Sequence, residues 1–332
     1  GMLPVPAAMA LSLSVVFPMH DEEAHVRRAV AAAREGATAV GEDYEIIIVD
    51  DASTDRTREI AEELATEDPR VRVLRNETNL GIPATRNRGI GAARGEFVAM
   101  LDSDDRAEPT RLAKQVRFLD RHPSPALVGS WFRYMDSEGR PGRVGRRPVH
   151  AKALRARLLF IGCYRNTTVM ARRGVLEGYS FRDEFQVAED LDLWTRISLD
   201  HYGANLPEVL VHYRRHPGGI SRERKDLGRR MKMKIAASQL ERLGVAYRES
   251  DLARHVDLRR PRRLERSRET FEWAAQWLEE LRQANRRARV YPEPHFGFAV
   301  AERWSELMQH LRRGEPDLGL GRNHLDHLEA MQ

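Results

Sequence analysis

Residues 46–51, Ile46-Ile47-Ile48-Val49-Asp50-Asp51, join an unbroken β-branched run to two adjacent carboxylates. β-branched residues favour strands, and a run without polar alternation predicts a strand buried on both faces, as in a parallel sheet. The two acids then lie at the carboxyl end of that strand. Because open parallel sheets bind ligands beyond the carboxyl ends of their strands, this short sequence indicates both a fold class and the edge where a site would lie.

The flanking segments repeat the pattern of a strand followed by a helix. Strands are predicted at residues 11–18, 44–50, 71–74, 97–101 and 126–135, and helices at 22–35, 54–67, 83–93 and 109–121. Short connections between such segments are typical of right-handed βαβ units. We therefore predict an α/β fold with a mostly parallel, Rossmann-type sheet flanked by helices.

The last third of the chain changes character. Mixed helix and strand signals up to residue 220 give way to long, Arg-rich helical patterns at residues 222–243, 265–289 and 298–313. We place a boundary at residue 221 and expect residues 11–221 to form the α/β domain and residues 222–332 to form a helical C-terminal region.

Composition narrows the class of protein. The 332 residues are 41% apolar, which permits a sizeable core, and 55 basic against 50 acidic side chains leave a net charge of only +5. The single cysteine, Cys163, excludes an intramolecular disulfide framework and fits a reducing compartment. The apolar N-terminal residues lack the basic flank of a signal peptide, and no stretch has the length of a transmembrane helix. We expect a soluble cytoplasmic protein.

Acidic residues follow several of the predicted strands. They are Asp21-Glu22, Asp50-Asp51 and Asp102-Ser103-Asp104-Asp105. Carboxylates crowded at one sheet edge repel one another and raise each other's pKa values. A hard divalent cation bound together with a phosphate-bearing ligand removes that conflict. Because alternate residues leaving a strand can direct two carboxylates at one point, Asp102 and Asp104 predict an Mg²⁺ or Mn²⁺ site.

Several motifs, in order, resemble those of family 2 glycosyltransferases with the GT-A fold. They lie at residues 15–22, 47–55, 79–81 with 84–87, and 101–105, and residues 188–194 resemble the family's later acidic motif. The likeness covers about residues 11–220 and implies a GT-A-like domain, with a nucleotide-binding part at about 11–106 and an acceptor part at about 107–221. It also implies a metal-dependent, inverting transfer from a nucleoside-diphosphate sugar, UDP by default, to a hydroxyl of a saccharide or lipid-linked acceptor. Such a reaction would serve the biosynthesis of cell-envelope polysaccharide.

The resemblance implies a role for each matching residue. The residues implied to bind the nucleotide sugar are Pro18, His20, Glu22, Asp51, Arg86, Asp102 and Ser103. The implied metal ligands are Asp104, Asp102 and His216. Asp190 would be the general base for the acceptor hydroxyl, with Glu189 able to exchange roles with it. The residues expected on the acceptor side are Glu189, Trp194 and Asn166. His20 departs from the tyrosine often found at its position in the family.

Other functions stay open. Asp50 and Asp51 after a buried strand also suit a metal-dependent phosphatase or nucleotidyltransferase, and the Arg-rich C-terminal region suits binding of nucleic acid or an anionic surface. Sparse aromatic residues between positions 222 and 268 argue against nucleic acid. Gly89-Ile90-Gly91 argues against a nicotinamide dehydrogenase, because it ends a predicted helix instead of opening one. The C-terminal region is expected to cover the acceptor, to form a homodimer or to touch the inner face of a membrane, and the sequence does not separate these roles.

Overall fold

The computed structural model describes residues 11–215 and 224–312. The chain divides into two compact units. Residues 1–151 and 164–223 belong to one, which we call the sheet unit, and residues 152–163 and 224–332 belong to the other, which we call the helical unit. A segment from the middle of the chain therefore folds with the C-terminal helices.

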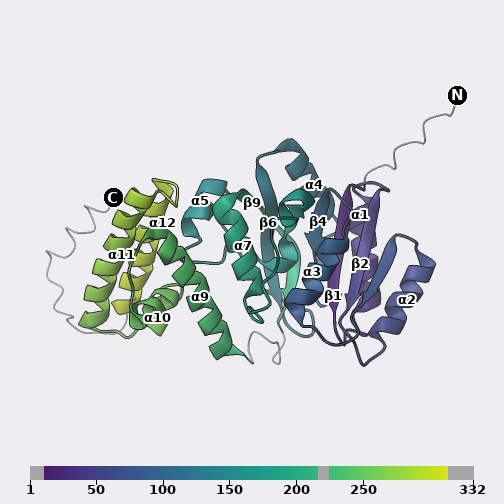
Figure 1. Cartoon of the computed structure of the whole chain (residues 1–332), viewed down its shortest axis with the longest axis horizontal. Helices are drawn as coiled ribbons and strands as arrows, with labels where there is room; N and C mark the ends of the chain where they lie inside the picture. The colour runs from purple at the N-terminus through teal and green to yellow at the C-terminus, as the bar shows by residue number, and fades with distance from the viewer. Residues whose placement is uncertain (1–10, 216–223, 313–332) are drawn as a thin grey trace. The chain divides into compact units, whose positions relative to one another are not determined.

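The sheet unit is built on one mixed sheet (Figure 1). Within the described residues its strand order is β3-β2-β1-β4-β8-β6-β9-β5, with β7 paired to β6. The strands are β1 (Leu13–Met19), β2 (Tyr44–Asp50), β3 (Val71–Arg75), β4 (Phe97–Met100), β5 (Arg106–Ala107), β6 (Pro125–Met135), β7 (Pro141–Gly145), β8 (Met170–Arg172) and β9 (Tyr202–Arg214). The first four pair in parallel, which confirms the predicted α/β fold. Beyond them β8 runs antiparallel to both β4 and β6.

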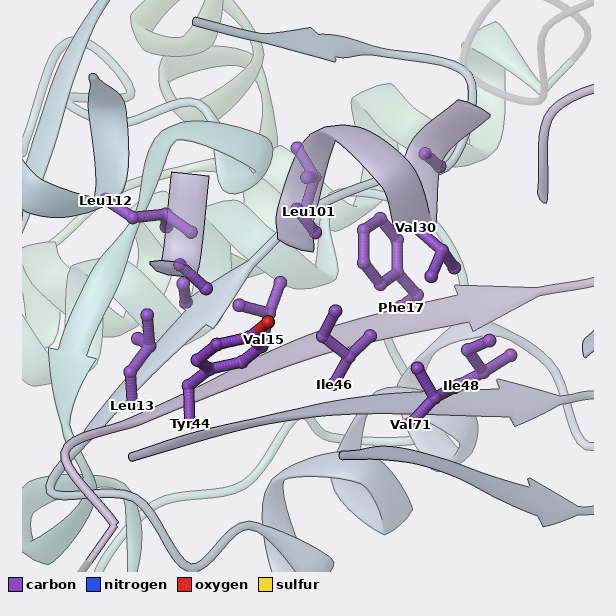
Figure 2. Close-up of a cluster of buried hydrophobic side chains, with 14 of the residues drawn as sticks. Leu13, Val15, Phe17, Val30, Tyr44, Ile46, Ile48, Val71, Leu101 and Leu112 are labelled. Carbon is purple, nitrogen blue, oxygen red and sulfur yellow. The ribbon is translucent and has the colours of Figure 1, made fainter. Parts of the chain in front are cut away.

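Helices cover both faces of the parallel strands. On one face lie α1 (Val26–Thr38), α2 (Thr57–Glu67) and α4 (Arg111–Arg121), and Figure 2 shows the core that they share with the sheet. Alternate side chains of β1, such as Val15 and Phe17, point into this core beside Ile46 and Ile48 of β2. The opposite face is covered by α3 (Ile82–Ala92). Every residue of β2 is buried, as a strand covered on both faces requires.

The close approach of α3 to the sheet depends on Gly89. A Cβ atom at Gly89 would lie 2.4 Å from Cγ1 of Val16 and 3.1 Å from Cγ2 of Val49. The helix backbone therefore packs directly on β1 and β2. Residues three apart share a helix face, so the same contact places the preceding Arg86 against the sheet.

The remaining helices of the sheet unit are short or lie toward the end of its chain. They are η1 (Asn166–Thr168), α6 (Arg173–Leu176) and α7 (Glu189–Asp200). α5 (Ala151–Arg157) carries the chain from the sheet unit into the helical unit.

The helical unit packs α9 (Lys225–Leu243), α10 (Glu249–Asp257), η2 (Pro261–Arg263), α11 (Arg268–Ala288) and α12 (His295–Leu311) around an apolar core. Aromatic rings fill much of it, and the ring of Phe160 stacks on that of Phe296 at 6.1 Å. Several arginines of this unit pair with its acids, including Arg229 with Asp257 at 2.8 Å. Among the described residues, no helix combines the length and apolar character needed to cross a membrane.

His255 is a buried polar residue in this core, with 1% of its surface exposed. The indole Nε1–H of Trp277 donates to Nδ1 of His255 at 3.1 Å, so Nε2 carries the proton and donates to the Leu159 carbonyl at 3.0 Å. Burial lowers the pKa of His255 to about 4. The imidazole is therefore neutral at physiological pH and serves packing.

Replacing Gly89 with alanine tests the packing of α3. The added methyl group overlaps Val16, so Gly89→Ala should reduce the free energy of unfolding by about 1–3 kcal/mol. Gly91→Ala is the matched control, because nothing lies within 4 Å of a Cβ there and alanine is the better helix former, by up to about 1 kcal/mol. Urea denaturation measures both variants. Equal effects at the two positions would contradict the close contact.

The buried imidazole makes stability depend on pH. An unfolded histidine has a pKa of about 6.5, so between pH ~4 and ~6.5 the unfolded chain binds the extra proton. The contribution of neutral His255 is complete above that window and falls, by up to about 1.4 kcal/mol per pH unit, as the pH drops through it. Urea denaturation across this range should show a shallower slope in His255→Gln and the wild-type slope in the exposed control His150→Gln. An unchanged slope in His255→Gln would refute the assignment.

Candidate functional site

The loops that follow β1 and β2 are tied together at the carboxyl edge of the sheet. Asp21 has a left-handed backbone, with φ of 54°, and its carboxylate accepts a hydrogen bond from the backbone of Thr54 at 2.7 Å. The backbone of Glu22 donates to the hydroxyl of Thr57 at 2.6 Å. These bonds fix the chain around Glu22, the next acid along the edge.

Glu22 meets the acidic motif that follows β4. Its half-buried carboxyl group hydrogen-bonds to Ser103 and lies within electrostatic reach of Asp104 and Asp102. Burial, and then the charge of Asp104, raise the pKa of Glu22 to about 7. The repulsion expected among carboxylates from separate strand ends is therefore present in the folded chain.

These oxygen donors are the type that Mg²⁺ and Mn²⁺ prefer. Across the described parts of the chain, no three or more His, Cys, Asp or Glu side chains come together as a complete metal site. Asp102 and Asp104 are the carboxylates that could hold such an ion, with its other ligands supplied by water and phosphate. His216, the third predicted ligand, lies outside the described residues.

Arg86 joins the end of β4 to the start of α7. Its Nη2 donates to Oδ1 of Asp102 at 2.9 Å, and its Nη1 donates to Oε1 of Glu189. The side chain is buried, and its guanidinium carbon lies 5.5 Å from the ring centre of Phe181. Burial raises the pKa of Glu189 to about 7, although the Arg86 guanidinium opposes the shift. A buried cation needs such partners, so Glu189 and Asp102 hold Arg86 in place.

The carboxylate of Asp190 is not paired with Arg86, as that of its neighbour Glu189 is. It is half-buried, accepts a hydrogen bond from the backbone of Leu191 at 2.7 Å, and lies within electrostatic reach of Arg86 and Arg165. Its place in the first turn of α7 also suits the helix dipole. Of the two acids, Glu189 is buried and bonded to Arg86, whereas Asp190 is half-buried and not bonded to Arg86.

Asp51 supports the loop that leads into α3. Its buried carboxylate accepts hydrogen bonds from the side chain of Asn76 at 2.6 Å and from the backbone of Leu80 and Gly81 at 2.9 Å each. The ring of His20 bonds to the carbonyl of Asp51 at 2.9 Å. A carboxylate has about four acceptor sites, so any bond from Asp51 to a base would use what these three donors leave.

Two buried ionisable side chains lie below the site: Arg111, which the sequence did not predict, and Asp105, which was noted among the acids but given no role. Arg111 is fully buried and donates to the carbonyls of Met100 at 2.9 Å and Val169 at 3.3 Å, which fixes the end of β4. Asp105 accepts a hydrogen bond from the backbone of Arg214 at 2.7 Å, and burial raises its pKa well above the ordinary range. A signal for Arg111 was its place on the apolar face of α4.

The remaining predicted site residues are Pro18, Asn166 and Trp194. Pro18 is half-buried at the end of β1, and Asn166 is buried with its Nδ2 3.5 Å from Oδ1 of Asp102. Trp194 is also buried, with 2% of its surface exposed, and its ring packs edge-on against Phe181 at 6.0 Å.

The phosphatase alternative finds little support in the geometry. Asp50 is 1% exposed, and its Oδ1 accepts a hydrogen bond from the backbone of Ser53 at 3.3 Å. The carboxylate of Asp51 is held by its three donors. Neither acid presents an accessible nucleophile, which phosphoryl transfer through an aspartate requires.

Comparison with known proteins bears on the family and the fold of the chain. The profile of glycosyl transferase family 2 matches residues 14–179. An uncharacterized glycosyltransferase of Haemophilus influenzae is 28% identical over 61% of this chain and 68% of its own length. The putative glycosyltransferase EpsE of Bacillus subtilis is 32% identical over 54% of this chain and 65% of its own length. A further relative, from Methanocaldococcus jannaschii, is matched over 59% of its length, so the chain spans less than two thirds of some relatives.

Solved structures share the fold at low sequence identity. Staphylococcus aureus TarS in complex with UDP has a TM-score of 0.57 and 21% identity, over 90% of this chain and 89% of TarS. The mannosyltransferase PcManGT from Pyrobaculum calidifontis, in complex with GDP-Man and Mn²⁺, has a TM-score of 0.55 and 16% identity, over 96% of this chain and 85% of PcManGT. The fold is that of the GT-A glycosyltransferases. With half of its residues matched by the family profile, the chain belongs to glycosyl transferase family 2 and is a glycosyltransferase.

Proposed function

We propose that the chain transfers a sugar from a nucleoside-diphosphate donor to an acceptor hydroxyl, with inversion at the anomeric carbon. The observation that carries this proposal is the meeting of Glu22, Asp102 and Asp104, from different strand ends, at one edge of the sheet. Carboxylates so placed repel one another, and a divalent cation bound together with a diphosphate removes that repulsion. UDP and GDP are the first nucleotides to test, because TarS is solved with UDP and PcManGT with GDP-Man.

Asp104, assisted by Asp102, is the proposed protein ligand of Mn²⁺ or Mg²⁺, with His216 as a further candidate. When bound, such an ion offsets the charge that develops on the departing diphosphate. The chain contributes the positioning: Arg86 holds Asp102, and Arg111 holds the end of β4 from below. Positioning of donor and acceptor supplies a large part of the rate in reactions of this kind.

Asp190 is the proposed general base. Its carboxylate takes the proton of the acceptor hydroxyl as that oxygen attacks the anomeric carbon, on the face opposite the leaving diphosphate. Glu189 is bonded to Arg86 and is therefore assigned to holding the site together. A single displacement of this kind inverts the anomeric centre.

We place the reaction in the cytoplasm, since the chain has a single cysteine, the buried Cys163, and so forms no intramolecular disulfide, which suits a reducing compartment. The acceptor is a saccharide or a lipid-linked molecule. Contact with the inner face of a membrane, or a homodimer, is the proposed role of the helical unit.

A thermal-shift screen of nucleoside diphosphates tests donor binding. With Mn²⁺ present, one nucleotide should raise the melting temperature, since a ligand at about 100 times its Kd stabilises by about 2.7 kcal/mol. Asp104→Ala should lose most of this shift, whereas the exposed α4 control Asp120→Ala should keep it. A screen in which no nucleotide moves the wild-type transition would defeat the proposal.

Asp190→Asn separates chemistry from donor binding. An amide cannot accept the proton, so kcat should fall by about 10²–10⁴-fold while the nucleotide-induced thermal shift persists. Donor turnover, with water as the acceptor if no other is known, provides the rate. Asp183→Asn, in the exposed loop before α7, is the control and should turn over normally. Full activity in Asp190→Asn would remove Asp190 from the role of base.

A further inference from the structure

Three aromatic rings lie in mutual contact on one face of β6 and β9. The ring centres of Phe132 and Tyr134 are 5.1 Å apart, those of Phe132 and Tyr213 are 6.2 Å apart, and those of Tyr134 and Tyr213 are 6.0 Å apart. All three pairs are edge-to-face. Alternation along β6 places Phe132 and Tyr134 on the same side, and the register pairs Tyr134 with Tyr213.

Four guanidinium groups surround these rings. Arg143 and Arg215 lie 4.5 and 5.2 Å from the ring centre of Tyr134, and Arg147 lies 5.0 Å from that of Phe132. Arg165 lies 4.3 Å from the ring centre of Tyr213 and 5.1 Å from that of Phe132. We call this set the arginine–aromatic face; its members are Phe132, Tyr134, Tyr213, Arg143, Arg147, Arg165 and Arg215.

The inference rests on two of these arginines, Arg143 and Arg165, and the acids within electrostatic reach of Arg165 are Asp190 and Asp105. Among residues 11–215 and 224–312, neither Arg143 nor Arg165 forms an ion pair with a carboxylate. The Nε of Arg165 is buried and has no hydrogen-bond partner among the same residues. Buried donors are nearly always satisfied in folded proteins, so this one indicates a missing acceptor. Stacking on a ring fixes a guanidinium and leaves the N–H groups at its edge available.

The face adjoins the proposed active site. Arg165 directly precedes Asn166, whose side chain lies 3.5 Å from Asp102. Burial alone would lower the pKa of Arg165, but Tyr213 and Asp190 raise it, so the guanidinium is charged. Burial raises the pKa of Tyr213 to about 12, which keeps its phenol a neutral donor. The proposed base Asp190 thus lies within electrostatic reach of the arginine–aromatic face.

We propose that the arginine–aromatic face binds a phosphate group of the acceptor, so that the hydroxyl to be glycosylated belongs to a phosphate monoester or diester. The inference rests on the function proposed for the same site. A neutral saccharide would leave Arg143 and Arg165 without an anion to pair with. A phosphate matches the planar fork of arginine and accepts from more than one of them. The same chemistry is offered by a soluble phosphate ester and by a polyprenyl phosphate in a membrane.

Binding to the full chain, with EDTA present, tests the inference without turnover. Calorimetric titration should detect glycerol 3-phosphate but not glycerol, and Arg165→Gln should weaken the binding about tenfold or more, the usual value of a hydrogen bond to a charged group. Arg143→Gln, at an exposed position, gives a second variant whose folding is not at risk. Arg58→Gln, in an exposed pair with Glu62 on α2, is the control and should bind as the wild type does.

A second arm separates the two sources of phosphate. Flotation with phosphatidylcholine vesicles, with and without a polyprenyl phosphate, should show Arg165-dependent binding to the doped vesicles if the acceptor is lipid-linked. Binding of neither probe, or binding that Arg165→Gln and Arg143→Gln leave unchanged, would overturn the inference. The nucleotide-induced thermal shift of Arg165→Gln must persist. If the nucleotide causes no thermal shift in the wild type either, the result counts against the proposed function and not against this inference.

Discussion

The repulsion among carboxylates at one edge of a parallel sheet is the constraint on which this structure depends. Parallel pairing aligns the ends of β1, β2 and β4, so the acids that follow these strands are brought together by the backbone itself. Burial raises the pKa of Glu22, and the charge of Asp104 raises it further, which is the direction that such repulsion produces. The fold keeps the acids close and holds them with cations and backbone donors.

Two buried arginines hold the acidic edge of the sheet in place, one from each face of the sheet. Arg86 reaches across from α3 to Asp102 and Glu189, and it can do so because Gly89 lets the helix backbone rest on the sheet. Arg111 reaches from α4, on the opposite face, and bonds to carbonyls at the end of β4. Both helices are therefore positioning elements, and their packing against the strands determines where the carboxylates lie.

The sequence was sufficient to predict the parallel strands, because continuous apolar runs and βαβ spacing are local signals. The run at residues 46–49 gave a strand whose bounds, Tyr44–Asp50, match the prediction. β5 and β7 were missed, since their few residues carry no periodicity, and the antiparallel direction of β8 depends on long-range pairing.

The site was predicted less completely for the same physical reason. Motif positions indicated which acids matter, but not their partners: the bonding of Asp51 by Asn76 and of Glu189 by Arg86 joins residues distant in sequence. The burial of Trp194 could not be predicted either, because an aromatic residue near a sugar site looks the same in sequence whether it is exposed or buried. The arginine–aromatic face brings together residues in or next to β6, β7, β9 and η1, so no single segment of the sequence predicts it.

The most direct test of the central claim is anomalous diffraction at the manganese edge, from crystals grown with Mn²⁺ and the nucleoside diphosphate that binds. The account predicts one strong peak within bonding distance of the Asp104 carboxylate, with the diphosphate beside it at the carboxyl edge of β4. A nucleotide bound elsewhere, or a manganese peak away from Asp102 and Asp104, would contradict it.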